Sequence, residues 1–200
     1  MSERDDPEIG ATAPGHYGPA PSGVTLAETT FATAWNVQGD AELFLFAETT
    51  RQVFGLVLPT TPNTTSPKDG LTALWLGPMS WLLVAAEGST LGDFAAKRAR
   101  INDARGALFD ITASCCAWTV GGPRAAMVLA KGCPLDFHPR AFAEGACAQS
   151  LFGHVNVLFH RRDASSFTLI VARSFARGVW RALCLSAAQY GYDVLPPRSY

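Results

Sequence analysis

The chain has 200 residues, of which 48% are hydrophobic and 16% are charged, and its formal net charge at pH 7 is −1. This length and composition describe one ordinary globular domain, or two small halves that share a core. The net charge supplies no overall field that would attract nucleic acid or an anionic membrane. We therefore interpret the basic clusters at 97–100 and 161–162 as solvated helix and hairpin surface.

Membrane, export and disulfide signals are weak in this sequence. No apolar run approaches the roughly 18 residues that a membrane span needs. The N-terminal residues are acidic and rich in proline and glycine, unlike a secretory signal, so we expect a cytoplasmic protein. The five cysteines are odd in number and contain no CxxC pair, which argues against a disulfide framework and against a structural zinc site.

The first half of the chain predicts an arm followed by alternating strands and helices. Residues 1–23 combine charge, proline and glycine with few apolar side chains, which is typical of a disordered or partner-strapping N-terminal arm. A first strand is expected near 31–37, and Asp40 is suited to cap the helix that follows and that Gly55 ends. Residues 71–76 and 81–85 predict a hairpin. Thr90 and Asp93 fit a capping box for a helix from 91 to about 101.

A long central strand is predicted over 107–120, where apolar side chains occupy the odd positions up to Ala117. Gly121-Gly122-Pro123 then breaks this strand and begins a helix, with Gly122 as the N-cap and Gly132 as the left-handed residue after its end. The central strand and this helix are the elements around which the rest of the chain is arranged.

The last third of the chain predicts two strands, a helix and a tail. Residues 148–160 predict a strand with a bend at Gly153, and 167–171 predict the next strand. Ser174 is suited to cap a final helix that ends before Gly191. The tail at 193–200 contains Pro196-Pro197 and no periodicity, so it should be irregular.

Two short echoes suggest an internal repeat. The letters AWNVQG at 34–39 recur as AWTVGG at 117–122, and LLVA at 82–85 recurs as LIVA at 169–172. We predict a single α+β domain over 24–192 that is made of two imperfect repeats, about 31–101 and 107–190. Each repeat would be a split βαβ, ferredoxin-like unit, and the two pseudo-symmetric units would share the long central strand. Chance is the alternative explanation, because the echoes are short.

Several motifs in order resemble a known family. FDITAS begins at Phe109, GPRAAMVLAKGCPLDFHPRAF at Gly122, LFGHVNVLFHRR at Leu151 and SFTLIVARSFARGVWRAL at Ser166. Over roughly 71–183 the chain resembles the gamma subunit of heterotetrameric sarcosine oxidase. More distantly, the layout resembles the folate-binding domain of the glycine-cleavage aminomethyltransferase family.

The resemblance implies a non-catalytic accessory or assembly subunit of a flavin-dependent sarcosine oxidase, which would oxidatively demethylate sarcosine or a related N-methyl amine. The implied partners are the alpha, beta and delta subunits, chiefly the large alpha subunit, with no nucleic acid and no membrane. No cofactor is expected in this chain. FAD, FMN, NAD, zinc and tetrahydrofolate are expected on the partner subunits.

The resemblance also bears on catalysis. Aminomethyl transfer of the glycine-cleavage kind uses a carboxylate on the strand after the central helix, and the matching segment here, 149–157, contains none. The nearest acids, Glu144 and Asp163, fall in predicted loops. Asp110 is the one acid in a family-like position, and an aspartate there more often caps a local turn than catalyses. We therefore predict no catalytic, cofactor-binding or metal-binding residues.

Two pairs containing cysteine have a chemical and a structural interpretation. Cys133 and His138 could be a nucleophile with its base, or two metal ligands, but no third ligand or orienting acid accompanies them, so we favour a buried thiol and a loop histidine. Cys115 and Cys116 should point to opposite faces of a strand and serve as small packing residues.

The remaining polar candidates have similarly plain interpretations. His154 and His160 share strand parity and should line one surface. Gly121-Gly122-Pro123 with Arg124 could form an anion-binding nest, but a strand-to-helix turn is the favoured interpretation.

The function of the chain stays open between three classes. Besides the accessory subunit, the sequence allows a free-standing folate-binding enzyme of the aminomethyltransferase type, and a regulatory module that binds a small molecule. Five tryptophans exceed what one small core obviously needs, so some of them are expected to anchor a permanent interface: Trp35, Trp75, Trp81, Trp118 and Trp180.

Overall fold

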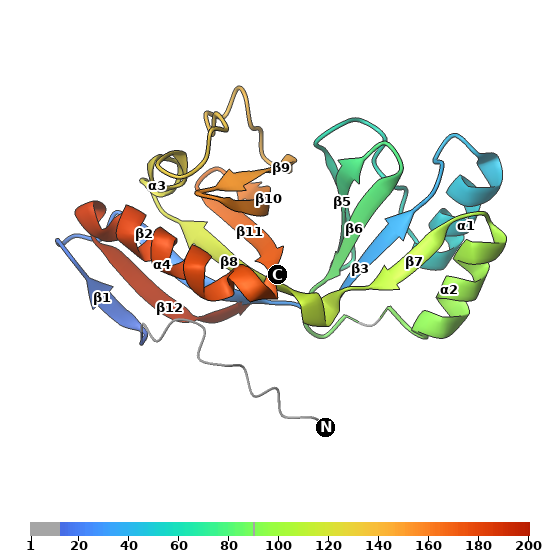
Figure 1. Ribbon diagram of the computed structural model, residues 1–200, viewed down its shortest axis with the longest axis horizontal. Coiled ribbons are helices and arrows are strands. Elements are labelled where there is room, and N and C mark those ends of the chain that lie inside the picture. Colours follow the sequence, from blue (N-terminus) through green and yellow to red (C-terminus); the bar gives the residue numbers. More distant parts are fainter. Residues whose placement is uncertain (1–12, 90) are drawn as a thin grey trace.

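The computed structural model describes residues 13–89 and 91–200, which form four layers (Figure 1). Two helices, a seven-stranded sheet, a five-stranded sheet and two further helices follow one another along the long axis of the molecule. The α+β class predicted from the sequence is confirmed. The helices are α1 (Phe44–Phe54), α2 (Phe94–Asp103), α3 (Ala125–Ala130) and α4 (Ala176–Ala187).

The two sheets are almost entirely antiparallel. The larger has the order β1-β12-β2-β8-β11-β10-β9, and only its β12–β2 pair is parallel. Its strands are β1 (Gly15–Tyr17), β2 (Val24–Thr30), β8 (Cys115–Gly121), β9 (Cys147–Phe152), β10 (Val155–Asp163), β11 (Ser166–Ala172) and β12 (Tyr192–Ser199). The smaller has the order β4-β5-β6-β3-β7, with strands β3 (Thr33–Gln38), β4 (Thr65–Lys68), β5 (Leu71–Gly77), β6 (Ser80–Ala85) and β7 (Ala107–Asp110).

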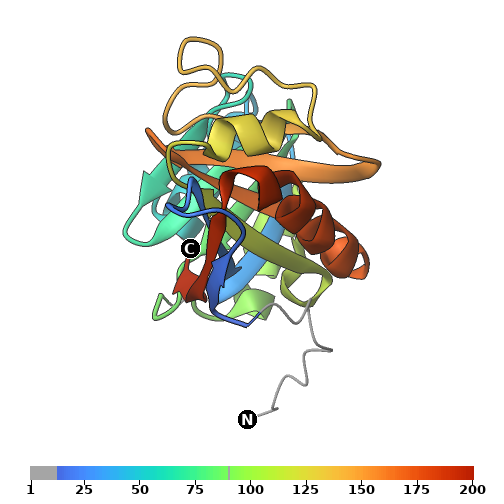
Figure 2. The same ribbon diagram turned by 90° about the vertical axis from the view of Figure 1, so that its left-hand side faces the viewer.

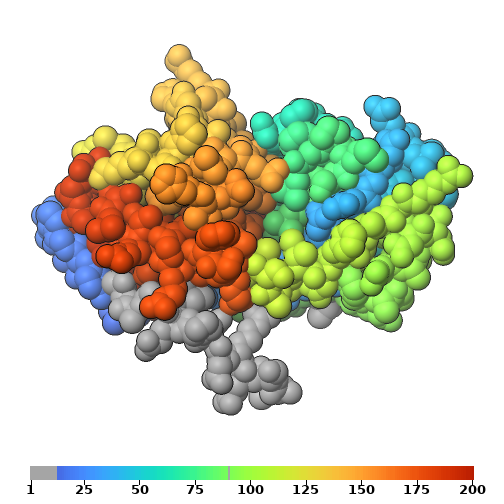
Figure 3. Space-filling view, viewed as in Figure 1, coloured from blue at the N-terminus to red at the C-terminus, as the bar shows by residue number. Residues whose placement is uncertain are grey.

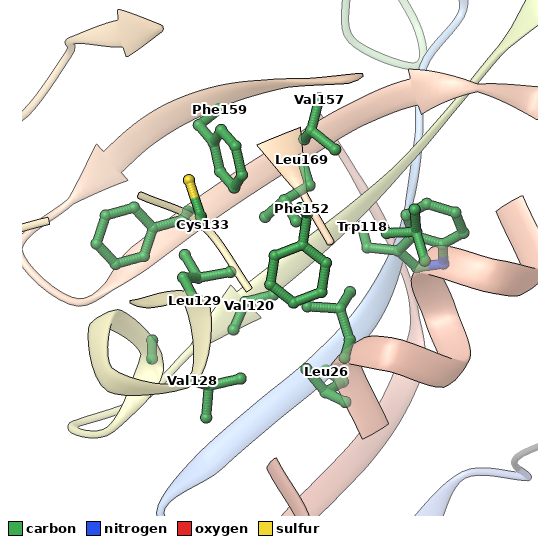
Figure 4. Packing of buried hydrophobic residues seen from close by; sticks show 14 of the residues in the cluster. Leu26, Trp118, Val120, Val128, Leu129, Cys133, Phe152, Val157, Phe159 and Leu169 are labelled. Carbon is green, nitrogen blue, oxygen red and sulfur yellow. The ribbon is translucent and has the colours of Figure 1, made fainter. Parts of the chain in front are cut away.

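Each interlayer space holds its own apolar cluster. In Figure 2, α3 and α4 lie in front of the large sheet, and Figure 4 shows the side chains buried between them, among them Trp118, Phe152 and Leu169. A second cluster, with Trp81 and Ile101, fills the space between the small sheet and α1 and α2. The third cluster joins the inner faces of the two sheets, and its buried members are Phe31, Ala34, Leu74, Leu82, Val84, Ala117, Cys147, Leu158, Ile170 and Tyr200.

Local signals placed several helix ends correctly. Gly55 follows α1 with a φ of 74°, the left-handed conformation that favours glycine at a helix end. Asp93 begins α2, and its Oδ1 accepts a hydrogen bond from the Ala95 backbone N–H at 2.8 Å, so it is the N-cap itself rather than the third residue of a capping box. Thr90, the other half of the predicted box, lies outside the described residues. The prediction that Asp40 caps α1 is wrong: the N-cap is Leu43, and the Asp40 Oδ1 accepts from the Glu42 N–H in the turn before the helix.

The predicted long central strand is wrong as a single element. A 3-10 helix, η1 (Thr112–Ser114), separates β7 from β8, so the chain leaves the small sheet and enters the large one. Asp110 causes this break, because its Oδ1 accepts hydrogen bonds from the Thr112 N–H at 2.9 Å and from the Thr112 hydroxyl at 2.6 Å. The alternation of apolar residues continues through the break and therefore conceals it.

The predicted irregular tail is also wrong, because most of it is strand β12. β12 pairs with β2 in parallel and with β1 in antiparallel register. The register shifts between Leu195 and Arg198, which places Pro196-Pro197 where no ladder hydrogen bond needs a backbone N–H. Strand β2, which the sequence analysis missed, lies between β12 and β8 in the sheet.

Part of the predicted arm is ordered against the domain. Strand β1 belongs to the predicted arm, and it pairs with β12 of the domain. The Tyr17 ring stacks on the Tyr192 ring, with the two ring centroids 5.3 Å apart. The Gly23 N–H donates to the Tyr190 carbonyl at 2.9 Å. Residues 13–23 are therefore neither disordered nor free, while residues 1–12 lie outside the described part of the chain.

Three further boundaries differ from prediction. Residues 148–160 form a hairpin of β9 and β10 rather than one bent strand, because Gly153 adopts a φ of 62° in a tight turn. α3 begins after Arg124, two residues later than expected. Gly132 does not adopt the left-handed conformation. A larger residue would not fit at position 132, because a Cβ there would lie 2.7 Å from the Phe152 ring. α4 follows a 3-10 helix, η2 (Arg173–Phe175), so Ser174 is not its cap.

We expect Gly122→Ala to destabilise the protein by about 1–3 kcal/mol. Gly122 has a φ of +102°, and a Cβ there would lie 2.9 Å from the Gly23 carbonyl oxygen and 3.2 Å from the Val24 Cα. The matched control is Gly178→Ala in α4, where a Cβ would meet nothing within 4 Å and helix propensity should raise stability by roughly 1 kcal/mol. Urea unfolding checks both, and equal stabilities of the two variants would contradict the strain argument.

We also expect the free energy of unfolding to fall as pH is lowered from about 6.5 to about 4. Burial, with a smaller effect of Arg162, lowers the pKa of His160 from 6.5 to about 4, and a 2.7 Å hydrogen bond joins its Nδ1 to the Tyr200 hydroxyl. In this window the unfolded chain binds a proton that the folded chain does not, so up to about 3 kcal/mol of stability is lost on acidification.

Denaturant unfolding at a series of pH values measures this dependence. His160→Gln should flatten the slope between pH 4 and 6.5, whereas His154→Gln, at an exposed turn position, should keep it. Identical slopes in the two variants would show that another group governs the acid sensitivity.

Candidate functional site

An apolar groove of about 700 Å³ lies where the two sheets meet. In Figure 3 the orange surface of β9 and β10 adjoins the green surface of β5 and β6 along this line. All its lining residues are uncharged: Leu76, Leu82, Ile111, Ser114, Cys115, Pro134, Gln149, Ser150, Leu151, Asn156, Val157, Leu158, Ile170, Val171 and Ala172. Such a lining suits an apolar partner surface or an apolar ligand with a few polar groups.

Cross-sheet hydrogen bonds hold one end of the groove. The Gln149 side-chain amide donates from β9 to the Leu76 carbonyl of β5 at 2.7 Å. The Cys147 thiol donates to the Trp75 carbonyl at 3.5 Å, and burial raises the pKa of this thiol to about 11. Cys147 is therefore a neutral structural contact at pH 7.

Segment 149–157 matches the strand that carries the catalytic carboxylate in aminomethyl transfer. Here it lies in the β9–β10 hairpin and lines much of this groove. Its polar side chains in the groove are amides and a hydroxyl, from Gln149, Asn156 and Ser150. Glu144 is an exposed loop residue, and Asp163 ends β10, where its Oδ1 accepts from the Ser165 N–H at 2.8 Å.

The other acid and thiol candidates have structural roles. Asp110 caps η1, as described above, which confirms the interpretation as a local cap. Cys133 is buried in the cluster under α3, while His138 is an exposed loop residue whose Nδ1 accepts from the Arg140 N–H. The structure therefore does not bring this pair together as a catalytic or metal site.

Cys115 and Cys116 face opposite sides of β8, as predicted, and neither forms a disulfide. Cys116 packs under the helices, whereas Cys115 borders the groove. Burial raises the pKa of Cys115, and the Arg173 charge opposes that shift only in part. The thiol that reaches the groove is therefore protonated at pH 7 and is a weak nucleophile.

The predicted surface shared by two histidines is wrong. His154 lies in the exposed β9–β10 turn, while His160 is buried against Tyr200. Strand parity does not apply to His154, because it lies in the turn before β10 begins at Val155.

The Gly121-Gly122-Pro123 segment is a strand-to-helix turn, as favoured. The Gly122, Arg124 and Ala125 N–H groups donate to carbonyls of Ser165, Gly23 and Gly122, at 3.0–3.1 Å. Because these donors already have partners, the segment does not present an anion-binding nest.

The prediction that Arg161 lies on the solvated surface is wrong. Arg161 is buried, with only 3% of its surface exposed to solvent. Its guanidinium donates hydrogen bonds to the carbonyls of Phe137, Phe142, Asp163 and Ala164 at 2.7–3.2 Å, and so ties the 134–146 loop to the hairpin end. Strand parity with Val157 and Phe159, which are both buried in β10, could have revealed it.

Four of the five tryptophans are buried in the core and are not exposed to a partner. Trp35, Trp81, Trp118 and Trp180 are buried, and only Trp75 is partly exposed. The expectation that tryptophans anchor an interface is therefore wrong for these four. In the described part of the chain, no helix is long and apolar enough to cross a membrane, and His, Cys, Asp and Glu do not gather in threes that could hold a metal ion.

Comparisons with known proteins agree with this architecture. A chain of heterotetrameric sarcosine oxidase from Corynebacterium sp. U-96, solved in complex with pyrrole 2-carboxylate, matches with a TM-score of 0.79 and 25% identity, over 87% of this chain and 88% of that one. The aminomethyltransferase T of the glycine cleavage system from Bartonella henselae shares the fold, with a TM-score of 0.57 and 13% identity, over 87% of this chain and 48% of that one.

Curated relatives point the same way. The gamma subunits of sarcosine oxidase from Corynebacterium sp. (strain P-1) and Arthrobacter sp. are 35% and 34% identical, over 54% and 51% of this chain and 52% and 49% of their own. The aligned region therefore spans about half the length of these relatives. The family model described as "Sarcosine oxidase, gamma subunit family" matches residues 38–189, which is well over half of the chain. The chain thus belongs to the sarcosine oxidase gamma subunit family.

Proposed function

We propose that the chain is a non-catalytic accessory subunit that assembles into a heterotetrameric, flavin-dependent sarcosine oxidase. The observation that carries the proposal is the likeness, over most of both chains, to a subunit of a solved heterotetrameric sarcosine oxidase. The complex would oxidatively demethylate sarcosine or a related N-methyl amine in the cytoplasm. The partners would be the alpha, beta and delta subunits, chiefly alpha, and these chains would carry FAD, FMN, NAD, zinc and tetrahydrofolate.

The roles of individual residues support a structural rather than a chemical contribution. The Asp110 carboxylate is committed to capping η1, and the Asp163 carboxylate to the turn before β11. Arg161 binds four backbone carbonyls. The groove is lined by uncharged residues and so offers no carboxylate for a proton transfer.

We further propose that the domain, predicted over 24–192 and extended to Ser199 by β12, consists of two imperfect copies of one split βαβ unit. Its support is the order of strands. Reading β4-β5-β6-β3-β7 against β9-β10-β11-β8-β12 aligns the elements of the two sheets one to one, with α1 and α2 corresponding to α3 and α4. The only interruption is β2, which is inserted between β8 and β12.

Exposed apolar side chains at the N-terminal end of α1 support a partner contact there. Phe44 is 80% exposed, and Leu45 beside it is half exposed. Met79 is also exposed, and its carbonyl accepts a hydrogen bond at 3.1 Å from the N–H of Gly39, five residues before Phe44. We propose that this patch, Phe44, Leu45 and Met79, contacts the large subunit, since monomers seldom expose neighbouring large apolar side chains without a role.

We expect the chain purified alone to be colourless and inactive toward sarcosine, because the flavins would be held by other subunits. Co-expression of the tagged chain with the neighbouring flavoprotein subunits should give a yellow complex that oxidises sarcosine and elutes as one species. Absorption spectra, peroxide formation and size-exclusion chromatography measure these outcomes. Failure to co-purify with any flavoprotein would contradict the proposal.

The apolar groove favours one alternative, a small-molecule or folate-binding protein that acts alone. Under that alternative the isolated chain would bind tetrahydrofolate saturably, and Ser150→Trp, which fills the groove, would abolish binding. Under the accessory role, calorimetric titration should give no saturable binding for either protein. Micromolar binding that Ser150→Trp removes would replace the accessory role with this alternative.

We expect Phe44→Ser to weaken retention of the partner subunits, while leaving the urea midpoint of the chain almost unchanged, because the ring is exposed. Loss of one well-packed aromatic anchor should cost roughly 2 kcal/mol of binding, about 30-fold in affinity. Glu42→Ser, at an exposed position in the preceding turn, is the matched control. Equal retention of both variants in a pull-down would place the interface elsewhere.

A further inference from the structure

We propose that a small polar cleft on the inner face of the large sheet binds a small oxyanion, that is, a carboxylate or phosphate group. The cleft has a volume of about 250 Å³, and Thr119, Thr168, Arg162, Arg198 and Tyr200 contribute to its lining. It is separate from the apolar groove, with which it shares no lining residue. The inference goes beyond the accessory role and does not depend on it.

Thr168 is the first observation behind the proposal. It is only 1% exposed, and its Oγ1 makes no hydrogen bond with the described protein atoms. A buried hydroxyl without a partner costs about 1–3 kcal/mol, so an acceptor that enters the cleft would recover that energy. Thr119, directly opposite Thr168 on β8, already shares a 2.7 Å hydrogen bond with the Thr29 hydroxyl.

Two arginines supply the charge. Arg162 comes from β10 and Arg198 from β12, and neither forms an ion pair with a carboxylate of the described residues. The Arg162 guanidinium lies 4.3 Å from the centre of the Tyr200 ring, a cation–π contact that restrains the guanidinium. Tyr200 is itself fixed, because its N–H donates to the Thr30 carbonyl at 2.8 Å.

The opposing charge in the cleft is smaller. Asp163 is the one acid of the lining, and its Oδ1 accepts from the N–H and hydroxyl of Ser165 at 2.8 and 3.4 Å. Among the side chains of the lining, two arginines face one aspartate, so these side chains carry a net charge of +1. Guanidinium groups remain charged at every ordinary pH and bind carboxylate or phosphate through two parallel hydrogen bonds.

Size restricts the ligand. Drug-sized ligands occupy pockets of about 300–1,000 Å³, so a cleft of about 250 Å³ suits a small anion or the end of a larger one. Two guanidinium groups and one buried hydroxyl in the lining are hydrogen-bond donors that match the several oxygens of a phosphate or a carboxylate.

The test is a titration of the full chain with sodium phosphate and, separately, with sodium acetate, with sodium chloride added to hold ionic strength constant. Isothermal titration calorimetry and the thermal midpoint report binding. The proposal expects saturable binding of at least one anion. Phosphate alone would identify a phosphate site, acetate alone a carboxylate site, and both a general oxyanion site. No saturable binding of either would overturn the proposal.

Variants separate a specific cleft from general charge effects. Arg198→Gln should weaken binding about 10-fold or more, since it removes a charge-assisted hydrogen bond. Arg140→Gln, in an exposed loop away from the cleft, should leave affinity unchanged. Thr168→Val should weaken binding several-fold while keeping or raising stability without anion, because it removes an unpaired hydroxyl. Equal affinity of Arg198→Gln and Arg140→Gln would overturn the site.

Discussion

Packing between the inner faces of the two sheets is the contact on which the rest of the structure depends. Leu74, Leu82 and Val84 of the small sheet meet Leu158 and Ile170 of the large one in a single apolar cluster. Neither sheet could leave this face in water without a large loss of hydrophobic stabilisation. Because each sheet covers its other face with two helices, this contact converts two small units into one four-layer body.

Cavities occur where that packing ends. The apolar groove opens where β5 and β6 diverge from β9–β11, and its floor is the continuation of the same apolar face. The polar cleft lies farther along the large sheet, where threonines replace leucine and isoleucine on the inner face. Tyr200 lies between these environments, since its ring belongs to the apolar cluster while its hydroxyl bonds to His160. One sheet face therefore presents two chemically different surfaces.

Several charged residues stabilise the fold rather than form a reactive site, which agrees with the accessory role proposed above. Arg161 is buried and holds the 134–146 loop through backbone carbonyls. Asp93 and Asp110 cap local turns. Large apolar side chains left at the surface, such as Phe44, are then the natural candidates for contacts with other subunits.

The sequence by itself determined the features that depend on neighbouring residues. These are the β5–β6 hairpin, the end of α1 at Gly55, the capping role of Asp110 and the opposite orientations of Cys115 and Cys116. The ordered motifs also indicated the gamma-subunit family, because such motifs survive in the linear sequence. Turn chemistry and strand parity act over a few residues, so they can be read without the fold.

Only the tertiary structure decided the remaining features. β12 became a strand because β2 and β1, more than 160 residues away, offered it backbone partners, and no local pattern in 193–200 records that. The division of β7 and β8 between two sheets likewise depends on the strands with which each one pairs. The groove and the cleft are formed by residues from distant strands, so neither exists in any segment of the chain. Local sequence patterns do not show which distant segments pair and pack, although the free energy of those contacts decides these features.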